Sequence, residues 1–160
     1  MKIIFTKRAY NSIVYEAVEK AGYETGGIFL GCHENGIWYV MENIGPGPEA
    51  VFTKSAFEYD HEFVERMINK KAALYKHEMN LIGLWHSHPE SFNEFSVVDN
   101  EINSEYSKLS EDGAISIIVN IAATEVLFDP SSLAPGEQPQ NPNFASKYLD
   151  SWRFVLSVNL

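Results

Sequence analysis

Cysteine is almost absent from this sequence: Cys32 is the only one among 160 residues. An intrachain disulfide is therefore excluded, and so is a zinc site built from paired CxxC thiolates. This usage is typical of a reducing compartment, and we expect a cytoplasmic chain. Cys32 itself lies in an apolar stretch and is interpreted as a small core residue rather than a reactive thiol.

Basic residues are also scarce. Lysine and arginine total 12 against 22 aspartates and glutamates, which gives a formal net charge of -10. Such a charge repels polyphosphate and removes the usual electrostatic contribution to nucleic-acid binding, so DNA and RNA are not expected partners. The same field favours a basic protein or a positively charged peptide tail, although an acidic surface can also serve solubility alone.

Long hydrophobic runs are missing as well. The first residues, MKIIFTKRAYN, contain a three-residue apolar run, and nothing later approaches the roughly 18 apolar residues of a membrane span. We therefore expect neither an export signal nor a membrane anchor. The hydrophobic fraction of 45% is that of an ordinary folded protein, and the length suits one domain over residues 1–160.

Hydrophobic spacing and turn residues predict strands interspersed with helices. Helices are expected over 9–21, from a cap at Asp60 to about His77, and from a cap at Ser96 through an apolar stripe of Ile102, Tyr106 and Leu109. Strands are expected over Lys2–Thr6, Gly26–Cys32, Ile37–Ile44, Ala50–Thr53, Leu81–Trp85, Ala114–Ile121, Glu125–Phe128 and Trp152–Val158.

Two connections in this pattern are distinctive. Asn35-Gly36 is a favoured hairpin turn between the second and third strands. The segment Asp129–Asn143 is rich in Pro, Ser and Gln and is expected to be an irregular insertion. It can cover an active site, contact a partner or be disordered, and the sequence does not separate these roles.

Three potential metal ligands follow the buried strand that ends at Trp85. His86 and His88 alternate by two, so in an extended backbone both imidazoles point the same way and can reach one ion. Asp99 follows after ten residues, in the first turn of the third helix, where a loop can bring its carboxylate back to the histidines. Two nitrogens and one oxygen leave a fourth tetrahedral position for water, which is typical of catalytic zinc. The alternative is a turn with two surface imidazoles and a helix-capping aspartate.

A hydrolytic zinc site also needs a base that is not a ligand. Glu24 is the candidate, because it opens Glu-Thr-Gly-Gly, whose paired glycines permit close approach of another element beside a buried strand. A solvated charge at the end of a strand is the other interpretation. Ser96 can donate its hydroxyl to the oxyanion formed when a carbonyl is attacked, but simple N-capping explains the same residue.

These residues resemble the signature of the JAMM (JAB/MPN) metalloproteases: a Glu, then at a distance His-x-His, ten residues and Asp. The resemblance implies an α/β fold, a single JAB/MPN domain with a mixed, curved β-sheet flanked by helices, of the cytidine-deaminase-like kind. It implies one zinc ion on His86, His88 and Asp99, with Glu24 as acid and base and Ser96 supporting the oxyanion. Phe95 departs from the pattern, since many members have proline there.

The surrounding residues, Trp85-His86-Ser87-His88-Pro89-Glu90 with Gly-Pro-Gly-Pro upstream, resemble a narrower bacterial branch: JAB-domain deconjugases of antiphage, ubiquitin-like conjugation operons. This implies a cytoplasmic isopeptidase that cleaves after the C-terminus of a ubiquitin-like protein, alongside E1- and E2-like enzymes, with the substrate tail extended beside Ala50–Thr53. Two alternatives stay open: processing of a sulfur-carrier ubiquitin-like protein, and a non-catalytic MPN scaffold.

The remaining histidines, His33, His61 and His77, lie in a turn, near a helix start and near a helix end. None has a partner at ligand spacing, so each is interpreted as an ordinary surface residue.

Overall fold

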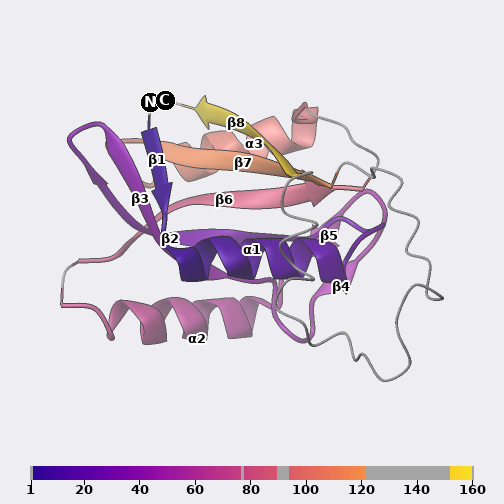
Figure 1. The fold of residues 1–160 in the computed structure, drawn as a ribbon, viewed down its shortest axis with the longest axis horizontal. Helices are drawn as coiled ribbons and strands as arrows, with labels where there is room; N and C mark the ends of the chain where they lie inside the picture. Colours follow the sequence, from indigo (N-terminus) through magenta and orange to yellow (C-terminus); the bar gives the residue numbers. More distant parts are fainter. Residues whose placement is uncertain (1, 77, 90–93, 122–151, 160) are drawn as a thin grey trace, which may run out of the picture.

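The computed structural model describes residues 2–76, 78–89, 94–121 and 152–159 (Figure 1). Within them three helices are present: α1 (Lys7–Glu19), α2 (His61–Ala72) and α3 (Val97–Ser107). The strands are β1 (Lys2–Phe5), β2 (Gly26–Glu34), β3 (Ile37–Ile44), β4 (Val51–Phe52), β5 (Phe57–Glu58), β6 (Asn80–His88), β7 (Ala114–Ile121) and β8 (Trp152–Asn159). The predicted strand Glu125–Phe128 and the insertion Asp129–Asn143 lie outside these residues.

Six strands form one mixed sheet in the order β1-β3-β2-β6-β7-β8. The β1–β3 and β6–β7 pairs are parallel, and the other neighbours are antiparallel. The strands β4 and β5 form a separate antiparallel pair. Figure 1 shows α1 across the near face of the sheet and α3 behind β7. The expected α/β fold with a mixed, curved sheet flanked by helices is confirmed.

The near face of the sheet packs against α1. Thr6 caps this helix by accepting a hydrogen bond from the backbone N–H of Ala9, and Ala9, Ile13 and Ala17 are buried at helical spacing. They join a core that includes Phe29 of β2, Trp85 of β6 and several β7 side chains. Burial of these side chains is the main contribution that holds the strands in register.

The other face carries a second cluster, in which Val64 of α2 packs with Ile28, Leu30 and Ile44. The sequence predicted α2 to run to about His77, but the helix ends at Ala72, and this prediction was too long. Beyond Ala72 the backbone N–H groups of Leu74 and Tyr75 donate to carbonyls three residues back, as in a turn, and Leu74 is 69% exposed.

The buried carboxylate of Glu42 ties three elements together. It lies on β3 and accepts hydrogen bonds from Arg8 of α1, from Lys71 of α2 at 3.2 Å, and from the Tyr75 hydroxyl at 2.5 Å. A buried carboxylate is costly without such partners. The Tyr75 contact also draws the chain off the helical path just after α2 ends.

The expected hairpin turn is confirmed. Asn35 and Gly36 both have positive φ, 52° and 76°, which is the backbone a two-residue primed turn requires. Of the two strands beside it, β3 has the predicted bounds, and β2 is longer than predicted because it continues to Glu34. The strand β6 is longer than predicted at both ends, from Asn80 to His88, because its backbone keeps pairing with β7 as far as His88 and Asn120.

Candidate metal centre and active-site cavity

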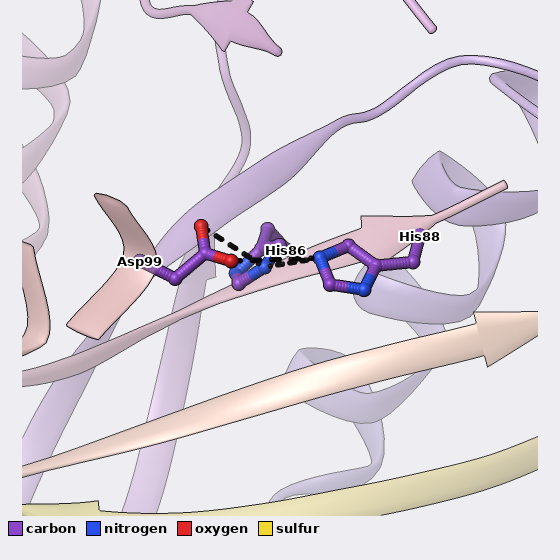
Figure 2. Close-up of side chains that lie close together, drawn as sticks. All are labelled: His86, His88 and Asp99. Atoms are coloured by element: carbon purple, nitrogen blue, oxygen red, sulfur yellow. Dashed lines mark hydrogen bonds and ion pairs between the residues drawn. The ribbon is translucent and has the colours of Figure 1, made fainter. Parts of the chain in front are cut away.

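The end of β6 carries both histidines on one face. His86 and His88 are 5% and 7% exposed, and their Nε2 atoms lie 2.9 Å apart (Figure 2). The intervening Ser87 points to the opposite face, where it contacts Thr25. The prediction that alternation would aim both imidazoles at one point is confirmed.

Asp99 completes the group from the first turn of α3. Its Oδ1 lies 3.5 Å from His86 Nε2 and its Oδ2 lies 3.7 Å from His88 Nε2. A capping box holds this carboxylate in place: the Ser96 backbone N–H donates to Asp99 Oδ2 at 2.7 Å, and the Asp99 N–H donates to Ser96 Oγ at 3.1 Å. The local chemistry of the helix start thus positions a ligand that is remote in sequence.

These three side chains can hold a metal ion. One ligand atom from each lies within 4.8 Å of the others. Two ligands of a tetrahedral zinc ion, with bonds of about 2.0–2.1 Å, lie about 3.3 Å apart, and the observed separations of 2.9, 3.5 and 3.7 Å are close to that. Two buried imidazole nitrogens this close must share a proton or a cation, and two nitrogens with one oxygen are a donor set that zinc accepts.

The electrostatics of the group favour a cation. Burial opposes ionisation of Asp99, but hydrogen bonds from His86 and Ser96 and the charge of His86 outweigh it, so the pKa of Asp99 lies below its usual range. The carboxylate is therefore ionised and available as a ligand at neutral pH.

Glu24 stands beside the metal group without belonging to it. Its backbone N–H donates to the Thr53 carbonyl at 2.8 Å, which fixes it between β4 and the start of β2. Burial raises the pKa of Glu24; the charge of His86 lowers it and that of Asp99 raises it, so all three groups lie within electrostatic reach. A partly buried carboxyl with a raised pKa beside a metal group has the character of a general base.

The two glycines after Glu24 permit the close packing that the sequence predicted. A Cβ on Gly26 would lie 2.3 Å from the Phe57 ring, and one on Gly27 would lie 2.5 Å from Trp85 Nε1. Any side chain there would push β5 or β6 away and move Glu24 relative to the histidines.

A cavity of about 870 Å³ unites all five predicted site residues, since Glu24, Ser96, His86, His88 and Asp99 line it. Apolar side chains form much of the remaining wall: Phe57, Tyr59, Leu84, Phe95, Val98 and Ile102. Sequence reasoning missed the contributions of β5 and of Asn103, which is buried and also lines the cavity. Asn103 could have been found, because it lies four residues after Asp99 and hence on the same face of α3.

The third helix is confirmed, but the expected apolar stripe is only partly buried. Tyr106 is half-buried, Ile102 is 44% exposed, and Leu109 is 67% exposed and lies beyond the end of α3, whereas Asn103 is the buried residue of this helix. The reason is the rotation of α3 about its own axis. The helix is oriented so that Asp99 faces the histidines, and Asn103, one turn later, therefore lies on the same inward side.

The other singled-out residues lie away from the cavity. Cys32 is half-buried on β2, and burial followed by the charge of Glu34 raises the pKa of its thiol, which disfavours a reactive thiolate. His33 is not an ordinary surface residue: it stacks on Trp38 with ring centroids 4.3 Å apart, and its Nδ1 lies 3.2 Å from Asp112. His77 lies outside the described residues.

The chain belongs to the family of prokaryotic homologues of the JAB domain, whose family model matches residues 6–130. The predicted JAB-type resemblance is confirmed. Among solved structures, the solution structure of protein DSY2949 from Desulfitobacterium hafniense is similar at 15% identity, over 76% of this chain and 77% of that chain, with a TM-score of 0.49. No curated protein matches the sequence. None of the helices described here is long and apolar enough to span a membrane.

Proposed function

We propose that this JAB-domain protein is a zinc-dependent isopeptidase that cleaves after the C-terminus of a ubiquitin-like protein or of a protein conjugated through its tail. The observation that carries the proposal is the convergence of His86, His88 and Asp99 in one cavity with Glu24, a carboxyl that is close to the metal group but is not among its ligands. A scaffold has no need of that fourth residue.

Zinc is the proposed ion because a two-histidine, one-carboxylate set is a catalytic zinc set, and a bound zinc ion supplies a water of lowered pKa and polarises a carbonyl. The protein's own residues do the rest. Glu24 takes the proton of the attacking water and delivers it to the leaving amine, for which its raised pKa is suited. Ser96, at the cavity wall, donates its hydroxyl to the oxyanion.

The shape of the cavity supports a polypeptide substrate. Lys54, Ser55 and Ala56, which join β4 to β5, line the cavity beside Glu24. Val51 of β4 is 58% exposed, and Thr53 is already hydrogen-bonded to the Glu24 backbone. An extended tail that runs beside 50–53 would place its last carbonyl at the metal group and would gain affinity from main-chain hydrogen bonds.

The biological setting forms part of the proposal. The motif resembles those of deconjugases in antiphage operons, so the substrate is expected to be joined to its target by E1- and E2-like enzymes. The charge of -10 suits a tail with basic residues.

The test uses a purified ubiquitin-like conjugate incubated with the zinc-loaded protein. We expect cleavage by the wild type, loss of cleavage with a chelator, recovery on adding zinc, and no cleavage by Glu24→Gln with full zinc content. Glu62→Gln, an exposed glutamate of α2, is the matched control and should cleave normally. An intact conjugate in every lane, with one zinc bound per chain, would reject the isopeptidase and leave a metal-binding scaffold.

A further inference from the structure

The amide of Asn103 is a buried polar group without a partner. The residue is 2% exposed, and within the described part of the chain neither its Nδ2 nor its Oδ1 makes a hydrogen bond. An amide offers two donors and an acceptor, so leaving all of them unpaired destabilises the folded protein. Such a group marks a place where another molecule supplies the missing partner.

The position of Asn103 identifies where that molecule lies. Asn103 lines the same cavity as Glu24 and the three metal-binding residues. It follows Asp99 by four positions, so the two side chains lie on one face of α3, and helical side chains lean toward the helix N-terminus. The Asn103 amide is therefore directed toward the turn that carries Asp99.

The surroundings select the chemistry of the ligand. Leu84, Val98 and Ile102 line the same cavity as Asn103, and their side chains offer no hydrogen bonds. In an apolar wall, a single carboxamide pairs best with a group that presents one acceptor and one donor side by side. The main-chain N–H and C=O of one residue in an extended polypeptide have this arrangement, because both point to the same side of the chain.

We propose that Asn103 binds the main-chain N–H and C=O of one residue of the substrate tail, on the acyl side of the scissile bond: its Nδ2 donates to the carbonyl and its Oδ1 accepts from the N–H. This inference rests on the proposed function and extends it. It assigns sequence-independent recognition of the tail to a residue of α3, in addition to 54–56, which line the same cavity. Asn103 makes no contribution to metal binding.

The test is a double-mutant cycle, in which one change is made at Asn103 and the other in the main chain of the substrate. The probe is an acetylated tetrapeptide with one arginine, joined through its C-terminal glycine to the Nζ of a lysine, and three analogues in which one main-chain amide at a time is an ester. An ester lacks the N–H and has a weaker acceptor. At one position we expect the wild type to lose about tenfold in kcat/KM, the loss of about one hydrogen bond.

With Asn103→Leu, which is close in size and apolar, that ester penalty should vanish, while KM for the all-amide peptide rises about tenfold. The same variant should unfold at a higher denaturant concentration than the wild type, because an unpaired amide has been removed. Asn100→Leu, on the exposed side of the same helix, should keep the ester penalty and the wild-type KM.

Each result separates the two proposals. Cleavage of the all-amide peptide with an ester penalty that is equal in the wild type and Asn103→Leu overturns the role of Asn103 and leaves the isopeptidase intact. A lower unfolding midpoint in Asn103→Leu without a change in KM assigns the amide to a structural role within the protein, and also overturns it. A wild type that neither binds nor cleaves the peptide overturns both.

Discussion

Ser87 and Thr25 are joined by three hydrogen bonds: the Ser87 N–H donates to the Thr25 carbonyl at 2.7 Å, the Ser87 hydroxyl donates to the same carbonyl at 3.5 Å, and the Thr25 N–H donates to Ser87 Oγ at 3.2 Å. Thr25 follows Glu24, and Ser87 separates the two histidines. Both residues are buried. The pair therefore couples the position of the proposed base to the position of the metal ligands.

Ser87→Ala should lower kcat by about 10- to 100-fold, because a small displacement of Glu24 relative to the metal group is costly to the reaction. The variant should also lose about 1–3 kcal/mol of unfolding free energy, since the buried Thr25 N–H loses its acceptor. Turnover of a conjugate and urea unfolding measure the two effects. Zinc content should be unchanged, and Ser104→Ala, on the exposed side of α3, should match the wild type. Normal kcat in Ser87→Ala would dismiss the coupling.

Asp99 has two roles that substitution can separate. It caps α3 through its Oδ2 and faces both imidazoles. Asp99→Asn retains an oxygen for the cap but loses the charge that binds a cation, whereas Asp99→Ala loses both. We expect both variants to bind zinc at least about 10-fold more weakly, by titration against a competing chelator. In metal-free protein, only Asp99→Ala should lose about 1 kcal/mol of unfolding free energy. Wild-type zinc affinity in Asp99→Asn would remove this residue from the site.

Ser96 also combines capping with its proposed oxyanion role. Its Oγ accepts from the Asp99 N–H. Replacing an N-cap serine with alanine costs about 1 kcal/mol of stability, while glycine costs a few tenths. If the hydroxyl stabilises the oxyanion, Ser96→Ala and Ser96→Gly should both lose about 10²- to 10³-fold in kcat despite their different stabilities. Activity that instead follows the unfolding midpoint of the two variants would assign Ser96 to capping alone.

The metal group was predictable because each of its determinants is local. Alternation along a strand aligns His86 with His88, and the Ser96 and Asp99 capping box fixes where a helix begins. These relations depend on a few neighbouring residues and hold in any surroundings. The family signature added Glu24, whose proximity depends on the pairing of β2 with β6 and cannot be read from spacing.

The orientation of α3 was not predictable from hydrophobic periodicity. The apolar side chains of Val97, Val98 and Ile102 are 76%, 62% and 44% exposed, whereas the polar side chain of Asn103 is buried. Which side of α3 is buried is set by the orientation of Asp99 toward the histidines and not by the spacing of the apolar residues along the helix. The early end of α2 has a similar origin, because Tyr75 bonds to the buried Glu42 on another element.

Glu16 provides a pH-dependent test of how α1 supports the site. Its Oε1 accepts a hydrogen bond from Thr25 Oγ1 at 2.9 Å, so it acts on the residue beside Glu24. Burial raises the pKa of Glu16, and the Thr25 bond and Lys20 only partly offset this. The folded state therefore binds the Glu16 proton more tightly than the unfolded state. This contribution to stability is present in full below the unfolded pKa and is lost as pH rises through the folded one.

Glu16→Gln keeps an oxygen for Thr25 but cannot ionise, so the variant should lack this loss. We therefore expect the variant to become more stable relative to the wild type, with a larger unfolding free energy, as the pH of metal-free protein is raised from about 4 to 7. Urea unfolding across that range measures the difference. Glu19→Gln, exposed on the same helix, should run parallel to the wild type. A constant difference between Glu16→Gln and the wild type would show that Glu16 titrates alike in both states, and a widening difference in the opposite sense would mean that its charge stabilises the fold.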